Sequence, residues 1–151
     1  MNLNKLYQEL ITDHSKNPKN FGINKSYNLD YRGHNPFCGD ELHIYLNLNK
    51  NKIIENISFS GSGCSIAIAS ASILTEIVKL KKEKEIKNII SFFLNTPKDK
   101  IYFSKNLGLN EKEKLAIKTL NSIKKYPLRI KCINLAWDVL KLILDKKIKI
   151  F

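Results

Sequence analysis

The hydrophobic positions change their period along the chain, and the change predicts helices around a small sheet. From residue 3 to residue 16, apolar side chains recur every three or four positions, which predicts an amphipathic helix. It ends near Pro18, because proline disfavours a helical conformation in the residue before it. Three stretches then alternate apolar and polar residues, as strands do: residues 27–31, 42–48 and 53–59. Turn-forming residues between the last two strands predict a hairpin within an antiparallel sheet.

A helical period returns in the second half of the chain. Residues 66–80 combine Ile and Leu at helical spacing with Ala and Ser, which predicts a helix whose small-residue face packs closely on the sheet. A short helix is expected at residues 86–94, followed by a loop over residues 95–109. These patterns predict an α+β fold, in which a three-stranded antiparallel sheet is packed by helices in a single compact domain over residues 1–151.

Two further helices are expected at the end of the chain. Asn110 is suited to cap one that runs to about Lys125, since acidic residues follow it in the positive first turn. Pro127 is expected to open the last helix. Apolar residues then follow at three- and four-residue steps, so Cys132 lies on the inward face of this helix.

Composition is consistent with one globular domain. With 151 residues, 43% of them hydrophobic, the chain can bury a core without disulfide or metal support. No apolar run approaches the roughly 18 residues of a membrane span, and no apolar signal region follows the N-terminus, so we expect a cytoplasmic protein without membrane association. Three cysteines cannot pair completely, and in a reducing compartment thiols more often bind metal or react.

The net charge of +12 does not by itself indicate a nucleic-acid site. Only Arg32 and Arg129 are arginines, and the remaining cationic residues are lysines. The chain is also rich in Asn and Ile, and Lys, Asn and Ile are the residues that AT-rich codons encode. We therefore interpret the charge as compositional bias spread over solvated faces and expect no nucleic-acid partner. The same bias makes Arg129 notable, because lysine does not reproduce the planar donor group of arginine.

Two of the cysteines lie in turns that favour chemistry. Cys38 and Asp40 flank Gly39 just before the second strand, so both side chains can point at one centre. Cys64 follows Gly-Ser-Gly at a junction between strand and helix, where backbone amides and the helix dipole favour the thiolate. A thiolate is both a nucleophile and a metal ligand.

The third cysteine completes a set of four potential ligands. Cys132 lies one helical turn after Arg129, which is close enough to stabilise an anion. Three thiolates and the Asp40 carboxylate are ligands that tetrahedral zinc accepts. Each element also has a simpler interpretation, since a single inward-facing cysteine is usually a small hydrophobic core residue and a Gly-Ser-Gly junction is often only a turn.

The histidines are rival ligands. His34 is four residues before Cys38 and ranks below Asp40 as a ligand, and His43 is most simply solvated on the polar face of its strand. The third histidine, His14, belongs to the N-terminal helix.

Three motifs resemble those of one family. The segments Asn35-Pro-Phe-Cys-Gly-Asp40, Gly61-Ser-Gly-Cys-Ser-Ile66 and Tyr126-Pro-Leu-Arg-Ile-Lys-Cys132 are similar to the cysteine motifs of the SufU/IscU (NifU N-terminal) iron–sulfur assembly proteins. Residues 14–22 are similar to the N-terminal signature of that family. The resemblance covers nearly the whole chain and implies the α+β fold expected above, with a metal site at one end.

Details of the motifs favour the SufU branch. Lys131 stands where IscU-type scaffolds carry His, and the segment from Lys81 to Leu107 is similar to the SufU insertion. The resemblance implies a Zn²⁺ site with four ligands and a SufS-type pyridoxal-phosphate cysteine desulfurase as partner. The ligands map onto Cys38, Asp40, Cys64 and Cys132.

The implied function is sulfur transfer. By resemblance, Cys38 is the residue that accepts persulfide sulfur, and Arg129 also fits the SufU pattern. The protein would then act as a sulfurtransferase-like carrier rather than a stand-alone enzyme, and would pass sulfur to a downstream iron–sulfur scaffold or to apo-proteins. We expect docking of the partner to release Cys38 from zinc, with Asp40 as the alternative ligand to leave.

Two other functions remain open from the sequence. An IscU-type scaffold would use the same thiolates to bind iron or a transient [2Fe-2S] cluster. A structural zinc-binding module would bind the metal without affecting the turnover of a desulfurase.

Overall fold

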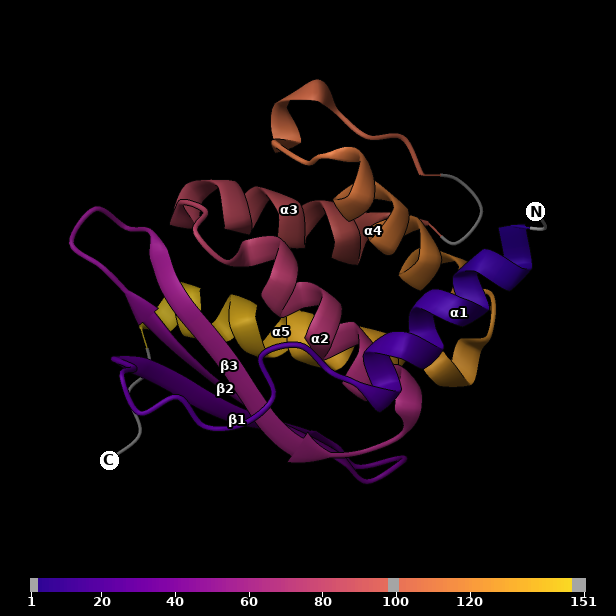
Figure 1. Ribbon diagram of the computed structural model, residues 1–151, viewed down its shortest axis with the longest axis horizontal. Helices are drawn as coiled ribbons and strands as arrows, with labels where there is room; N and C mark the ends of the chain where they lie inside the picture. Colours follow the sequence, from indigo (N-terminus) through magenta and orange to yellow (C-terminus); the bar gives the residue numbers. More distant parts are fainter. Residues whose placement is uncertain (1–2, 98–100, 148–151) are drawn as a thin grey trace.

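Three antiparallel strands form the sheet that carries part of the candidate site. The computed structural model describes residues 3–97 and 101–147 (Figure 1). The strands follow the order β1-β2-β3, with the bounds β1 (Leu29–Asn35), β2 (Asp40–Leu48) and β3 (Ile54–Ser62). Alternation places Leu42, Ile44 and Leu46 on the inner face of β2, where none of them is exposed. This confirms the predicted three-stranded sheet and the hairpin predicted between its second and third strands, and the first two strands form a hairpin as well.

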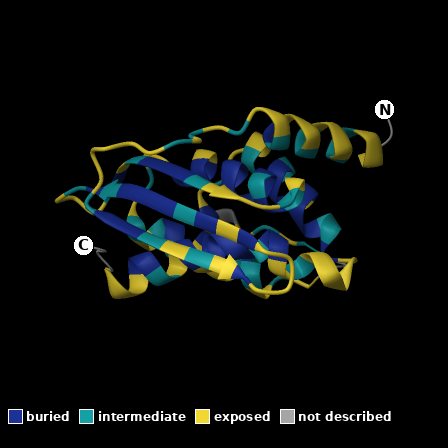
Figure 2. Ribbon diagram, turned by 90° about the horizontal axis from the view of Figure 1, so that it is seen from below, coloured by how far each residue is buried: buried dark blue, intermediate teal, exposed yellow. Residues whose placement is uncertain are grey.

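Helices cover the inner face of the sheet. Helices α2 and α5 contact the strands, and α1 packs on α2 (Figures 1 and 2). The helical elements are α1 (Leu3–Lys16), α2 (Ser65–Val78), α3 (Glu83–Asn95), α4 (Glu111–Ile123) and α5 (Ile130–Lys146), with short 3-10 turns η1 (Lys105–Leu107) and η2 (Pro127–Arg129). The small residues expected on α2 are buried, but Ala67, Ala69 and Ala71 follow at two-residue steps and so lie on more than one side of a helix that is buried nearly all round.

Several element boundaries differ from the prediction, and two of the differences bear on the candidate site. Tyr27 precedes β1, which instead continues to Asn35 and so carries the strand up to the candidate site. Pro127 opens the turn η2 rather than α5, and the helix itself begins three residues later at Ile130. The predicted cap of α4 is confirmed, since Asn110 and Glu113 form a reciprocal capping box. Within residues 3–97 and 101–147, no helix is long and apolar enough to cross a membrane.

The loop predicted for residues 95–109 contains the turn η1, and its residues 98–100 lie outside the described part of the chain.

A contact on the outer face of the sheet corrects the expectation for His43. His43 is not simply solvated, because its Nε2 lies 2.6 Å from Oδ2 of the buried Asp30 and its ring stacks on Tyr45.

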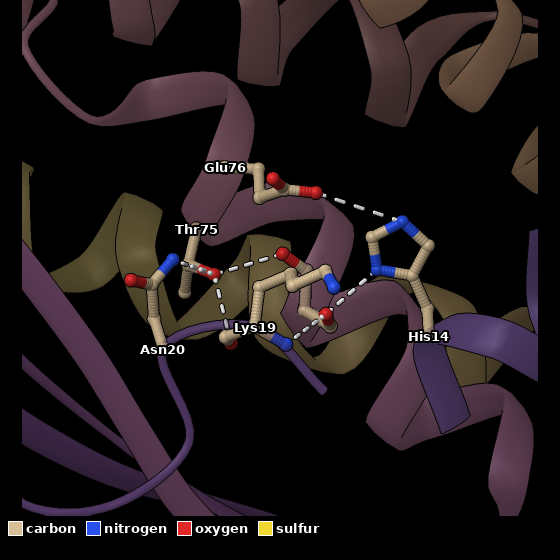
Figure 3. A network of polar contacts seen from close by, with 6 residues as sticks. His14, Lys19, Asn20, Thr75 and Glu76 are labelled. Carbon is tan, nitrogen blue, oxygen red and sulfur yellow. Dashed lines mark hydrogen bonds and ion pairs between the residues drawn. The ribbon is translucent and has the colours of Figure 1, made fainter. Parts of the chain in front are cut away.

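A polar network attaches the end of α1 to α2 (Figure 3). His14 is buried, with Nδ1 2.7 Å from Oγ of Ser72 and Nε2 3.7 Å from Oε1 of Glu76. The backbone N–H of Lys19 also donates to Ser72, and the side chain of Asn20 donates to Thr75. The histidine of the N-terminal signature therefore has a structural role, in that it fixes α1 against the helix that follows Cys64.

His14 makes the stability of the metal-free protein depend on pH. Burial lowers the pKa of His14 below its ordinary value of 6.5, so the unfolded chain binds this proton more readily than the folded chain. The stability that neutral His14 contributes is complete above pH 6.5 and is lost as the pH falls from 6.5 through the lower pKa of the folded state. The urea midpoint of the wild type should fall as the pH is lowered through this range. In His14→Gln the midpoint should change less over the same range, because the titrating group is absent. Equal changes in the two proteins would contradict this role.

Candidate metal centre

The turn between β1 and β2 presents Cys38 to solvent and Asp40 to the interior. Asn35 and Asp40 are paired across the two strands, and the backbone N–H of Gly39 donates to the carbonyl of Asn35 at 2.9 Å. Gly39 has φ +71°, a left-handed conformation that glycine adopts without strain. As a result Cys38 is exposed, whereas Asp40 has no exposed surface.

Asp40 joins this turn to the first turn of α2. Its Oδ1 accepts a hydrogen bond from the backbone N–H of Cys64 at 2.8 Å. Cys64 is the N-cap of α2, and its sulfur accepts from the N–H of Ala67 at 3.4 Å. A Cβ on Gly63 would lie 2.6 Å from Oδ1 of Asp40, so only glycine lets the carboxylate approach the helix in this way. The Gly-Ser-Gly junction is therefore more than a turn, because it makes room for a candidate ligand.

Cys132 approaches the same point from the first turn of α5. It is fully buried, and its Sγ lies 3.3 Å from Sγ of Cys38. The Sγ atom of Cys38 also lies 3.0 Å from Oδ2 of Asp40. The ligand atoms of these three residues all lie within 4.8 Å of one another. Cys64 falls outside this group of three, with Sγ 4.0 Å from Oδ2 of Asp40.

The separations fit a tetrahedral zinc ion. With bonds of about 2.3 Å to sulfur and about 2.1 Å to oxygen, such an ion keeps two sulfurs about 3.8 Å apart and a sulfur and an oxygen about 3.6 Å apart. In the structure, the sulfurs of Cys38 and Cys132 are 3.3 Å apart, and Oδ2 of Asp40 lies 3.0 Å from Sγ of Cys38 and 4.0 Å from Sγ of Cys64. Each differs from the tetrahedral value by about half an ångström. Cys38, Asp40 and Cys132 therefore suit zinc in both chemistry and spacing, whereas Cys64 comes near Asp40 but lies outside the group of convergent ligand atoms.

The charges of these groups are arranged for a cation. The hydrogen bond to Asp40 raises the pKa of Cys38, and burial, together with the neighbouring Cys38, raises the pKa of Cys132. Burial alone would raise the pKa of Asp40 as well, but hydrogen bonds from Cys38 and from the N–H of Cys64 outweigh it and lower that pKa. Without a cation, a carboxylate thus faces protonated thiols, and a bound metal ion would favour the thiolates instead.

Asn35 is a part of the site to which the sequence assigned no role. It is buried, and its Nδ2 donates to Sγ of Cys38 at 2.7 Å and lies 4.0 Å from Sγ of Cys132. Its Oδ1 accepts from the N–H of Phe37 at 3.2 Å. One amide therefore shapes the turn and donates to sulfur, which favours the thiolate form. The only sequence signal was its position within the first cysteine motif.

The remaining candidates lie apart from this cluster. His34 is exposed and does not belong to the group of three residues with convergent ligand atoms. Arg129 is exposed on η2 and lines an apolar surface hollow with Ile66, Tyr126 and Leu128. The hydrogen bonds described above for Cys132 come from Cys38 and Asn35 and not from Arg129.

Comparison with known proteins gives consistent results across the chain. The family model of the NifU-like N terminal domain matches residues 6–132. A zinc-dependent sulfurtransferase SufU from Bacillus subtilis is 36% identical over 141 residues, which cover 93% of this chain and 90% of the relative. An iron–sulfur cluster assembly scaffold protein IscU from Streptococcus pyogenes is 34% identical, over 92% of this chain and 82% of the relative.

A solved structure shares the fold. It comes from Fervidobacterium islandicum and represents a protein proposed as an iron–sulfur cluster assembly scaffold for the SUF system. The two structures align with a TM-score of 0.73 and 29% identity, over 93% of this chain and 98% of the other.

Proposed function

The chain belongs to the family of NifU-like N-terminal domains, and from this premise we propose that it is a zinc-dependent sulfur acceptor in iron–sulfur cluster assembly. In this proposal Cys38, Asp40, Cys64 and Cys132 bind the zinc ion. Its partner is a SufS-type pyridoxal-phosphate cysteine desulfurase in the cytoplasm, and the sulfur continues to an iron–sulfur scaffold or to apo-proteins. The similarity to a zinc-dependent sulfurtransferase over 93% of the chain supports this assignment.

One observation carries the proposal most directly. Of the two thiols in contact, Cys38 is exposed and Cys132 is fully buried. A partner that delivers sulfur reaches Cys38 first, and Cys132 stays behind as a ligand. Bound zinc would supply an ion that favours thiolates and that, having no redox chemistry, would itself oxidise neither the thiolate nor an incoming persulfide.

The chain's own residues perform the transfer. The thiolate of Cys38 attacks the outer sulfur of the partner's persulfide, a new sulfur–sulfur bond forms, and the partner's cysteine leaves as a thiolate. No net oxidation or reduction takes place, because one persulfide replaces another. Asn35 donates a hydrogen bond to the attacking sulfur. We assign Arg129 the role of stabilising the incoming anion from its exposed position on η2.

A cluster scaffold is the second candidate, favoured by the similarity to IscU of Streptococcus pyogenes over 92% of the chain. It would use the same thiolates to hold a [2Fe-2S] cluster. Anaerobic reconstitution, followed by transfer of the cluster to an apo-protein, distinguishes a scaffold from a sulfur acceptor.

The proposed function is tested by the effect of the protein on its partner. We expect the purified, zinc-loaded protein to increase alanine formation by a SufS-type desulfurase, because an efficient acceptor removes the persulfide that otherwise blocks the next turnover. A structural zinc module would bind metal and leave the rate of alanine formation unchanged. That result would refute the proposal.

A further inference from the structure

Phe37 precedes Cys38 in the chain and Lys131 precedes Cys132, and these two preceding residues also contact each other. Nζ of Lys131 lies 3.8 Å from the centre of the Phe37 ring, next to the 3.3 Å contact between Cys38 and Cys132. Phe37 belongs to the turn between β1 and β2, and Lys131 belongs to the first turn of α5. The cation–π pair therefore joins the same two elements as the thiol pair does.

The contact of Lys131 with Phe37 is a second connection between the turn and α5 that does not involve a thiol. The hydrogen bonds of its backbone, and those of Cys38 to Asn35 and Asp40, stay within the hairpin, whereas the sulfur of Cys38 also contacts Cys132 on α5. A turn held to α5 by the thiol pair alone would lose that attachment when Cys38 is released, unless another contact remains. The contact of Lys131 with Phe37 supplies one at the outer rim, above the buried Cys132.

The geometry distinguishes this pair from the other lysine–aromatic contacts at the surface. A cation within about 6 Å of a ring centre is attracted by the face of the ring. Lys114 and Lys118 lie 5.9 and 5.8 Å from Phe103, and Lys125 lies 5.2 Å from Tyr126. At 3.8 Å, Lys131 is much closer to its ring, although the ring of Phe37 is 79% exposed.

We propose that Phe37 and Lys131 form a clamp that restrains the Cys38 turn against α5 and slows the release of Cys38 from the metal centre. The proposal rests on the proposed function, since it assigns to the clamp control over when the acceptor thiol is free. Both are positioning residues, which act through the turn and not on the sulfur that is transferred. A partner that contacts the exposed ring of Phe37 would open the clamp on docking.

The test compares variants that keep or lose the clamp. Exposed cation–π pairs contribute about 0.5–1 kcal/mol, which corresponds to an effect of roughly two- to fivefold. We expect Phe37→Leu and Lys131→Met each to accelerate zinc transfer to a chromogenic chelator by this factor. In zinc-free protein, Phe37→Leu retains the lysine charge and should accelerate alkylation of Cys38 by iodoacetamide, resolved by peptide mass spectrometry. Phe37→Tyr and Lys131→Arg should behave like the wild type.

A double-mutant cycle separates the clamp from independent effects. If the two residues act as a pair, the double variant releases zinc no faster than either single variant. Lys125→Met is the matched control, because it removes a lysine from Tyr126 without touching the Cys38 turn. Additive effects, or zinc release from Lys131→Arg as fast as from Lys131→Met, would overturn the clamp.

The outcomes also distinguish the clamp from the proposed function. If the wild type stimulates the desulfurase and the cycle shows no coupling, only the clamp is wrong. If the cycle shows coupling and no stimulation occurs, only the sulfur-acceptor function is wrong. Unchanged zinc release in Phe37→Leu together with weaker binding to the desulfurase would overturn the clamp and make Phe37 a docking residue.

Discussion

Replacing Cys38 by alanine is expected to abolish sulfur uptake from a cysteine desulfurase while part of the zinc remains bound. Cys38 is the exposed member of the contacting thiol pair, so its loss removes the nucleophile that the partner reaches. In the proposed site, Asp40, Cys64 and Cys132 would remain as three ligands, and zinc accepts three protein ligands with a water in the fourth position. Mass spectrometry of the protein after incubation with desulfurase and cysteine measures uptake as the gain of sulfur atoms.

Two further variants make this result specific. Cys38→Ser retains the size of the side chain and should also take up no sulfur, because a hydroxyl is a poor nucleophile at neutral pH. Ser62→Ala, at the exposed end of β3, should take up sulfur at the wild-type rate. Uptake that survives in Cys38→Ala would assign the acceptor role to another thiol, and Cys64, which is partly exposed, would be the next residue to test.

The sequence predicted the secondary structure well where one pattern dominates. The bounds of α1 match the predicted range of residues 3–16, and the cap of α4 at Asn110 was identified from its acidic neighbours. The start of α5 was less accurate, because a proline at the first position suits a 3-10 turn as well as an α-helix. His43 was misjudged for a different reason. It is directly opposite Arg32, and its partner Asp30 is diagonal to it, so the contact depends on a register that alternation alone does not define.

The sequence predicted which residues belong to the candidate site better than it predicted the contacts among them. Motif chemistry indicated Cys38, Asp40, Cys64 and Cys132, and the structure brings the ligand atoms of three of them within 4.8 Å of one another. The roles of Asn35 and Gly63 required coordinates, because each depends on how the turn and α2 approach Asp40 and the thiols. Contacts between segments far apart in the chain, such as these, leave no pattern in the local sequence.

Trp137→Ala is expected to cause a large loss of stability, because Trp137 connects α5 to α2. Trp137 is fully buried on α5, its ring stacks on Phe93, and its Nε1 donates to Oγ of Ser70 on α2 at 3.0 Å. Ser70 in turn donates to the carbonyl of Ile133, the residue after Cys132, at 2.7 Å. Truncating a buried tryptophan to alanine costs about 3–5 kcal/mol, a large part of the roughly 5–15 kcal/mol of a typical domain.

Because α2 carries Cys64 and α5 carries Cys132, the same substitution should weaken zinc binding as well as the fold. Urea unfolding of the zinc-free protein, followed by far-ultraviolet circular dichroism, measures the loss of stability, and competition with a chelator measures zinc affinity. Trp137→Phe retains a ring against Phe93 but loses the hydrogen bond to Ser70 and part of the buried indole volume, so it should destabilise the protein less than Trp137→Ala does. Leu128→Ala alters a side chain that is 90% exposed and should change stability by less than about 0.5 kcal/mol. A urea midpoint for Trp137→Ala equal to that of Leu128→Ala would show that the contact between the helices is maintained without this indole.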